Sequence, residues 1–414
     1  MPLIALWSSN RAAIDEFTIE QVVATAGDGN LRDGSVCSQE LRAYFSEVTS
    51  SKLDIYIERC LSQHFNKSGM VLQDLVNELG RRLDYKVTNG RYQGTSNAIG
   101  YDGLWTSPEG RTIIVEVKTT DAYRISLQTI ATYRERASAN GEVNLPSSIL
   151  IVVGREDTGE LEAQVRGSRH AWDIRLISAD ALIKLVQLKE DADAPDTGRK
   201  IRSLLAPMEY TRLDQMIDIM FTTAKDVETA AVVETATQVE EFGDLAPSNT
   251  VVDLSTEPTK AWGFTDAALL QGKRDLIIDA LSRHEKINLI KRTRALYWDA
   301  GHTVRVACTI SKRYTKRGGY PYWYAHHPAW EDFLAEGKKA FLVLGCMDLA
   351  VAFVVPWAAL HSILDGLNTT RREDNFYWHI HLAESGHGEL AMLIPKRDTV
   401  LRLGQFALPL NLVS

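Results

Sequence analysis

Two carboxylates and a lysine stand at a spacing that suits the hydrolysis of a phosphodiester. Asp102 stands at the end of one predicted strand, and Glu116 and Lys118 end the apolar run that begins at Ile113. Such hydrolysis needs a metal that stabilises charge on the phosphoryl group and lowers the pKa of a bound water. Carboxylate oxygens, which Asp102 and Glu116 supply, are ligands that Mg²⁺ prefers. The Lys118 ammonium would lie beside the attacking water and stabilise developing charge.

A β-hairpin would bring these three side chains together. We predict strands over residues 99–105 and 112–118, joined by the turn Ser107-Pro108-Glu109-Gly110. Strand alternation would place Glu116 and Lys118 on one face and turn Val117 into the core.

Helices and further strands must flank this hairpin to hold it. The hydrophobic periodicity predicts helices over residues 70–83, 126–137 and 179–188 and further strands over 85–87, 148–153 and 173–177. This order is typical of an α/β layer with a mixed central sheet.

Asp102, followed by Glu116-Val117-Lys118 at the end of an apolar strand, resembles the Asp…Glu-x-Lys signature of the PD-(D/E)XK nuclease superfamily. This superfamily includes restriction endonucleases, Mrr-like enzymes and RecB-type nucleases, and the resemblance covers roughly residues 65–190. It implies a restriction-endonuclease-like αβββαβ core and DNA cleavage that depends on Mg²⁺, for which Mn²⁺ could substitute. Asp102, Glu116 and the Val117 carbonyl would bind the metal. Tyr101 replaces the proline of the signature, at a position that supplies no ligand.

Two further residues would assist under this resemblance. The superfamily often adds an acidic residue from the helix before the hairpin, and Glu78 is our choice, with Gln73 and Asp74 as competitors. Gln128, on the following helix, could contact a phosphate or orient the water. RecB-type members carry Gln-x-x-x-Tyr there, whereas Gln128 and Tyr133 are one residue too far apart.

Basic segments in two places are candidates for DNA contact. Arg166 and Arg169 would grip phosphates from a loop between two strands, or form an ordinary solvated turn. Residues 312–324 interleave aromatic side chains with Lys312, Arg313, Lys316 and Arg317, which suits phosphate contact and base stacking. The alternative is a basic hairpin whose aromatic side chains pack inward. His379 and His381 share a face of a predicted strand, and we interpret them as structural histidines.

The chain has 414 residues and a net charge of −8, so nucleic acid would need a local basic surface. We expect an N-terminal helical segment (1–65), a nuclease domain (66–190), a helical connector (198–226), an acidic linker (227–260) and an α+β C-terminal recognition or sensing domain (261–414). That last domain would have helices over residues 269–300 and strands later. Scattered cysteines and the lack of a signal peptide or membrane span predict a cytoplasmic protein.

Taken together, these features predict an endodeoxyribonuclease of restriction or phage defence. One alternative is a defence effector that stays inactive until a ligand or partner binds its C-terminal domain. The other is a DNA-binding protein that uses the fold without cleavage. Because two cuts on a duplex usually require two sites, a homodimer is a reasonable expectation.

Overall fold

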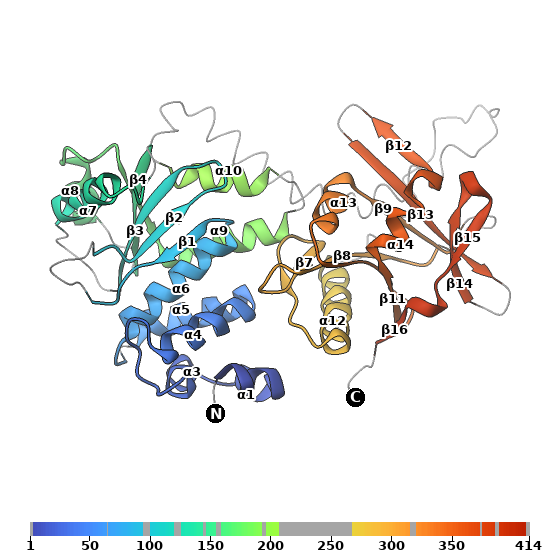
Figure 1. Ribbon diagram of the computed structural model, residues 1–414, viewed down its shortest axis with the longest axis horizontal. Helices are drawn as coiled ribbons and strands as arrows, with labels where there is room; N and C mark the ends of the chain where they lie inside the picture. Colours follow the sequence, from blue (N-terminus) through green and yellow to red (C-terminus); the bar gives the residue numbers. More distant parts are fainter. Residues whose placement is uncertain are drawn as a thin grey trace, which may run out of the picture. The chain divides into compact units, whose positions relative to one another are not determined.

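The structure is a computed structural model that describes residues 3–63, 65–93, 100–119, 126–143, 146–154, 159–192, 196–206, 267–314, 320–372, 375–385 and 389–410. The chain divides into two compact units, Met1–Ala224 and Lys225–Ser414, which we call the N-terminal and C-terminal units. Both are drawn in Figure 1. Most of the predicted connector, the acidic linker and residues 261–266 lie outside the described residues. In the described ranges, no helix has the length and apolar character needed to cross a membrane.

A five-stranded mixed sheet forms the centre of the N-terminal unit. Its strands lie in chain order: β1 (Lys86–Asn89), β2 (Gly103–Thr106), β3 (Thr112–Lys118), β4 (Ser147–Val153) and β5 (Ile174–Ser178). The first three pair antiparallel, whereas β3, β4 and β5 run parallel. All seven residues of β4 are buried, as expected for a parallel strand covered on both faces. The mixed α/β class predicted from the sequence is therefore confirmed.

Helices cover both faces of this sheet (Figure 1). One apolar cluster joins the odd-numbered residues of β3 to α6 (Ser68–Arg82), α9 (Ala179–Asp191) and α10 (Thr197–Leu204). A second cluster joins Ile114 of β3 to α7 (Leu127–Ala139) and α8 (Gly159–Arg166) on the opposite face. The two faces of β3 therefore meet different helices, and this decides which side chains can reach the end of that strand.

The N-terminal helices extend the first of these clusters. They are α1 (Leu3–Ser9), α2 (Arg11–Asp15), α3 (Ile19–Thr25), α4 (Val36–Glu47) and α5 (Ser50–Ser62). Their buried residues belong to the same cluster as α6 and α9. The described part of residues 3–63 is mainly helical, as predicted, and shares one continuous core with the sheet.

The C-terminal unit contains two sheets. Strands β6 (Ile290–Lys291), β7 (Leu296–Trp298), β8 (Val304–Ser311), β10 (Lys339–Cys346), β11 (Val351–Pro356) and β16 (Ala407–Pro409) form one sheet. The other sheet contains β9 (Tyr322–His326), β12 (Thr369–Arg372), β13 (Asn375–Ser385), β14 (Glu389–Ile394) and β15 (Thr399–Arg402). The helices are α12 (Ala267–Glu285), α13 (Pro328–Ala335) and α14 (Trp357–His361), with 3₁₀ turns η2 (Leu364–Gly366), η3 (Pro395–Arg397) and η4 (Gly404–Phe406).

These two sheets face each other across a shared apolar core. Leu342 and Leu344 of β10 meet Ile380 and Leu382 of β13 in that cluster. On the other face of the first sheet, α12 packs against alternate residues of β8 and β10. The unit is thus a layer of helix on two stacked sheets.

The structure corrects two expectations about local elements. The first helix of the C-terminal unit ends at Glu285 and does not continue toward residue 300, because Lys286 takes a left-handed φ of 55° and a strand pair follows. Helix α8 occupies residues predicted as loop, so Arg166 ends a helix. Strand β9, which follows the basic segment, pairs with β13 of the second sheet, and the Tyr314 N–H donates to the Pro321 carbonyl at 2.9 Å.

Candidate active site

Asp102 lies directly before β2, and both its backbone and its side chain bind β3. Its N–H donates to the Val115 carbonyl at 3.0 Å, and its Oδ2 accepts from the Val117 N–H at 2.7 Å. The turn that joins β2 to β3 closes through the Gly110 N–H, which donates to the Ser107 carbonyl at 2.9 Å. Gly110 has a φ of 82°, a conformation that favours glycine. The hairpin predicted from the sequence therefore holds Asp102 beside the end of β3.

Glu116 and Lys118 share the face of β3 that packs toward α7, and Val117 packs against the opposite cluster, as predicted. The Lys118 Nζ donates to Glu116 Oε1 at 2.5 Å. Glu116 is only 8% exposed, and its Oε2 is buried without a hydrogen-bond partner among the described residues. A buried carboxylate oxygen without a partner costs free energy, so this atom marks a position that a cation would stabilise.

The Asp102 and Glu116 carboxylates bring two negative charges close together in a largely buried site. Burial, and then repulsion from Glu116, raise the pKa of Asp102 to about 7. Burial acts to lower the pKa of Lys118, but the Glu116 and Asp102 carboxylates outweigh it and raise that pKa above its ordinary value. Two facing carboxylates with one ammonium would gain stability from a divalent cation between them.

The donor atoms at this edge fit a hard cation. The N–H and C=O of one strand residue point to the same side, so the Val117 carbonyl points to the side on which its N–H meets Asp102. Two carboxylates and a carbonyl are the oxygen ligands that Mg²⁺ accepts, usually together with water. Across the described residues, no group of three or more His, Cys, Asp or Glu side chains is placed to hold a metal. A cation here would therefore rely on backbone and water oxygens to complete its coordination.

Two buried amides of α6 contact Asp102 from the other face of the sheet. The Gln73 Nε2 and the Asn77 Nδ2 donate to the Asp102 carbonyl at 3.0 and 2.9 Å. Asn77 also accepts the Trp105 Nε1–H through its Oδ1 at 2.9 Å. Gln73 entered the sequence analysis only as a competitor for a metal-binding acid, and Asn77 was missed. The available signal was a pair of polar residues one helical turn apart on an apolar face.

The acidic residues of α6 have partners away from Asp102. Glu78 accepts from Arg81 and Arg82, each at 3.3 Å, and α6 covers the face of the sheet opposite to the Glu116 side chain. Asp74 pairs with Arg42 at 2.8 Å and also accepts from the Tyr92 hydroxyl. The structure thus does not bring Glu78 together with the two carboxylates.

Helix α7 supplies one neighbour of the site that sequence reasoning did not select. A Cβ at Gly100 would lie 2.8 Å from the Tyr133 hydroxyl, and Tyr133 also contributes to the raised pKa of Lys118. Gln128 instead lies on the exposed side of α7. Its Oε1 accepts from Arg169 Nη2 at 2.7 Å, and no hydrogen bond joins it to Asp102, Glu116 or Lys118 in the described part of the chain.

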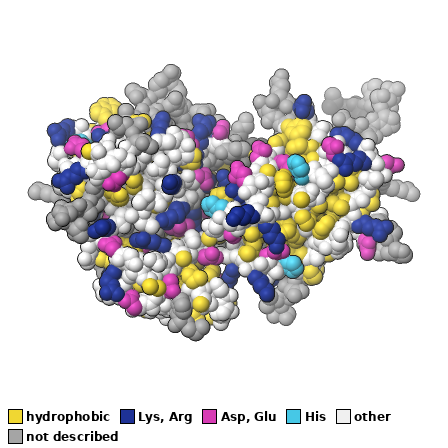
Figure 2. Space-filling model, in the orientation of Figure 1, with side chains coloured by type: hydrophobic (Ala, Val, Ile, Leu, Met, Phe, Trp, Pro, Cys, Tyr) yellow, Lys and Arg dark blue, Asp and Glu magenta, His cyan; other side chains and the backbone are white. Residues whose placement is uncertain are grey.

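The basic residues proposed for DNA contact lie in different settings. Arg169 is exposed beside Gln128, and Arg166 is exposed with Glu162 at 3.8 Å. In the C-terminal unit, Lys312 lies over the Tyr314 ring, and Arg313 pairs with Asp348 and Glu384 at 2.9 Å each. Lys316 and Arg317 lie outside the described residues. On the face drawn in Figure 2, Lys and Arg side chains are scattered among Asp and Glu.

The aromatic side chains of β9 alternate between two environments. Tyr322 and Tyr324 pack in the core between the sheets, while Trp323 turns to the other face, where His379 and His381 of β13 also lie. The sharing of one face by the two histidines is confirmed. The His379 Nε2 bonds to the Thr370 hydroxyl at 2.7 Å, which gives that ring a structural partner.

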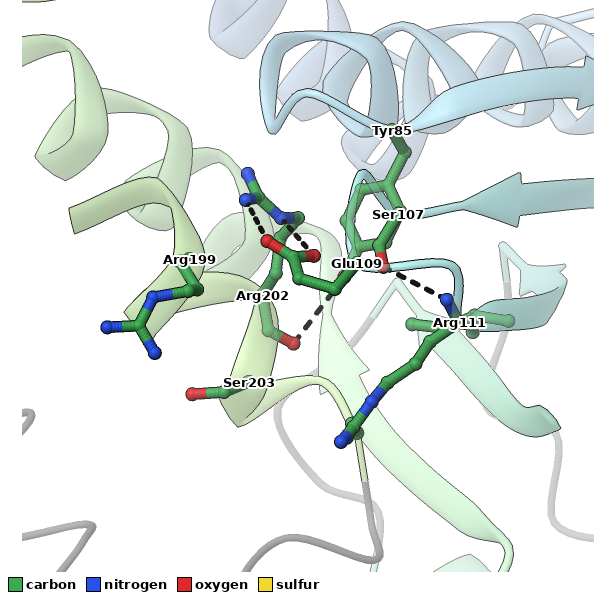
Figure 3. Close-up of a pocket in the computed structure, with 9 residues that line it drawn as sticks. Tyr85, Ser107, Glu109, Arg111, Arg199, Arg202 and Ser203 are labelled. Carbon is green, nitrogen blue, oxygen red and sulfur yellow. Dashed lines mark hydrogen bonds and ion pairs between the residues drawn. The ribbon is translucent and has the colours of Figure 1, made fainter. Parts of the chain in front are cut away.

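A cavity of about 200 Å³ lies at the other end of the β2–β3 hairpin, beside its turn. In Figure 3 the Glu109 carboxylate faces the Arg202 guanidinium of α10, while Arg111 and Arg199 extend away from that pair. Arg202 Nε donates to Glu109 Oε2 at 3.1 Å, and Arg202 Nη1 donates to Asp84 Oδ2 at 3.1 Å. Ile113, which lines this cavity, precedes Glu116 by three strand residues, so roughly 10 Å of strand separates the two. We interpret the Arg202 bonds beside this cavity as structural contacts that fix the hairpin turn to α10.

Sequence comparisons do not extend this description. None of the known family models matches the chain, and the search of curated proteins gives no significant match.

Proposed function

We propose that this chain is a Mg²⁺-dependent endonuclease that hydrolyses DNA phosphodiester bonds. The observation that carries the proposal is the pair of carboxylates at the end of the hairpin, with one buried Glu116 oxygen lacking a partner and Lys118 beside it. Asp102, Glu116 and the Val117 carbonyl would hold the cation, for which Mn²⁺ would substitute.

The order of elements supports the same proposal. α6, the three antiparallel strands β1 to β3, α7 and the parallel strand β4 follow one another in the chain. This order agrees with the αβββαβ core that the Asp102, Glu116 and Lys118 resemblance implies. In that core the acidic residues belong at the end of the hairpin, where they lie in this chain.

Each residue would have a distinct role in hydrolysis. The bound cation would supply a water of lowered pKa and stabilise charge on the phosphoryl group. Lys118 would exchange its bond with Glu116 for one to the attacking water or to a phosphoryl oxygen. Arg169, exposed beside α7, would hold a backbone phosphate and thereby position the duplex.

A cleavage assay with matched variants tests the proposal. Supercoiled plasmid, linear duplex and single-stranded DNA are incubated with the full chain and Mg²⁺, then with EDTA. Glu116→Gln removes one ligand charge, and Lys118→Met keeps the length of the side chain but removes the ammonium. Glu160→Gln and Lys86→Ala alter the same residue types at exposed positions and serve as controls. We expect each site variant to lose about 10²-fold or more in rate, with both controls unchanged.

The outcomes separate the proposal from its alternatives. Cleavage that persists in both site variants would remove Glu116 and Lys118 from the mechanism. Binding of DNA without cleavage of any form by the wild type would favour a DNA-binding protein. Cleavage that appears only after a ligand or partner is added would favour a gated effector, with the C-terminal unit as the sensing part.

We further propose restriction or phage defence in the cytoplasm as the setting. The support is architectural, since a second compact unit of different fold accompanies the candidate nuclease unit. A second copy of the chain would be needed for cutting both strands at once. The pattern of ends cut from a defined plasmid, with chain mass measured in solution, tests both points.

A further inference from the structure

The Asp102 carbonyl is held by three donors at once. Gln73 Nε2, Asn77 Nδ2 and the Gly90 N–H donate to this oxygen at 3.0, 2.9 and 2.9 Å. Asn77 is 1% exposed and Gln73 is 4% exposed, although they lie on the apolar face of α6. Buried amides in such a place are retained only when their polar atoms are satisfied, and here the peptide of Asp102 satisfies them.

The orientation of the Asn77 amide is fixed by its second partner. Trp105 Nε1–H can only donate, so the Asn77 atom that faces it must be the oxygen. The amide NH₂ is then directed at the Asp102 carbonyl. Asn77 thereby ties the Asp102 carbonyl, just before β2, to the Trp105 ring three residues further along the chain.

The close approach of α6 leaves no room for a side chain at the neighbouring glycine. A Cβ at Gly103 would lie 2.2 Å from Asn77 Oδ1. The strand therefore lies directly against the amide, and a shift of Asp102 along the strand would break its contact with Asn77.

We infer that Asn77 and Gln73 are positioning residues that fix Asp102 relative to Glu116 by holding the Asp102 peptide from the opposite face of the sheet. This inference rests on the proposed metal site. In the absence of a cation the two negative carboxylates repel each other. An unrestrained strand end would move so that the distance between them increases. The amides resist that relaxation, so the site exists before the cation binds.

The test compares metal binding with stability in the full chain. Gln73→Met and Asn77→Leu keep the approximate size of each side chain but remove its donor. Tyr44→Phe is the control, because it removes the buried 2.8 Å bond to Tyr56 in the N-terminal helices and leaves the site untouched. Mn²⁺ binding is measured by calorimetry without DNA, half-saturating Mg²⁺ by plasmid cleavage, and Tm by thermal unfolding in EDTA.

We expect both α6 variants to bind Mn²⁺ about 10- to 100-fold more weakly and to need correspondingly more Mg²⁺, with much of the rate recovered at saturation. The Tyr44→Phe variant should unfold at a lower Tm than the wild type, with the same Mn²⁺ affinity and the same half-saturating Mg²⁺ concentration. The inference is wrong if the α6 variants behave like this control. If Asn77→Leu does not fold, the Gln73→Met variant alone tests the inference, because it leaves the bond between Asn77 and Trp105 intact. A wild type that binds no Mn²⁺ would overturn the proposed function itself.

Discussion

Asp102→Asn removes a buried negative charge that faces a second one on Glu116, so we expect the metal-free chain to gain stability from this change. The asparagine keeps an oxygen that can accept the Val117 N–H, as Asp102 Oδ2 does at 2.7 Å. Its NH₂ group would lie near Glu116, whose Oε2 has no partner in the described residues. The substitution thus relieves repulsion without removing the hydrogen bond that orders the hairpin.

The magnitude follows from the raised pKa of Asp102. Burial and Glu116 raise this pKa from 3.8 to about 7, and one pKa unit corresponds to about 1.4 kcal/mol. The ionised carboxylate at pH 8 therefore destabilises the folded state by at most about 4 kcal/mol, and local relaxation reduces this to about 2–4 kcal/mol. Because the folded-state pKa is the higher one, the penalty is complete above pH 7. It shrinks steadily as the pH falls from 7 toward 4, and it disappears below the unfolded pKa of 3.8, where the carboxyl is protonated in both states.

Thermal unfolding in EDTA at pH 8 and pH 5 measures this effect. For a unit of this size, 1 kcal/mol corresponds to about 2–4 °C, so Asp102→Asn should raise Tm by about 4–16 °C at pH 8 and by clearly less at pH 5. Added Mn²⁺ should then stabilise the wild type and leave the variant unchanged, because only the wild type binds the cation. A lower Tm for Asp102→Asn at pH 8 in EDTA would refute the reasoning, since the carboxylate would then stabilise the fold.

Three further changes test other parts of the structure. Arg202→Met removes the buried guanidinium that bonds to Glu109, and we expect a loss of about 1.5–3 kcal/mol in the free energy of unfolding, measured in denaturant, because the exposed Glu109 carboxylate can be solvated. Arg169→Ala should weaken DNA binding evenly across sequences and lower the salt slope of the binding constant by about 1, whereas an unchanged slope would place Arg169 away from the phosphates. Lys118→Met should retain Mn²⁺ binding by calorimetry while cleavage falls about 10²- to 10³-fold, and a loss of binding would instead make Lys118 necessary for holding the metal site together.

Local chemistry is what allowed the hairpin to be predicted from the sequence. The apolar run that ends in Glu116-Val117-Lys118 is short, continuous and rich in β-branched residues, as is typical of a strand buried on both faces, and the turn at residues 107–110 contains proline and a glycine with positive φ. Strand geometry then fixes which side chains share a face, independent of any distant contact. The positions of Glu116, Val117 and Lys118 on β3 followed from these rules.

The supporting residues depend on contacts that the sequence does not display. Helix α6 presents Gln73 and Asn77 toward Asp102, while Glu78 faces Arg81 and Arg82. Periodicity alone identifies the apolar face of such a helix but does not say which polar residue at its edge meets the strand.

The strand pairing of the C-terminal unit likewise could not be predicted from local sequence patterns. Its second sheet joins β9 to β13, and strand pairing between segments far apart in the chain has no local signature. Strand β8 belongs to one sheet and β9 to the other, and no local pattern in the basic and aromatic residues after Ser311 indicated that change of sheet. The inward packing of Tyr322 and Tyr324 was nevertheless among the alternatives considered.

The bonds that tie the hairpin turn and the N-terminal helices to α9 and α10 affect the order in which this protein can assemble on the ribosome. Arg202 reaches Glu109 across 93 residues, and Ser50 reaches Glu190 across 140 residues. At a synthesis rate of roughly 5–20 residues per second, the earlier partner waits about 5–30 s for the later one. During that time the hairpin turn lacks its partner on α10, and the growing chain would hold Asp102 only through α6 and the neighbouring strands. Under the proposed function, full cleavage activity would therefore appear only after nearly the whole unit has been made.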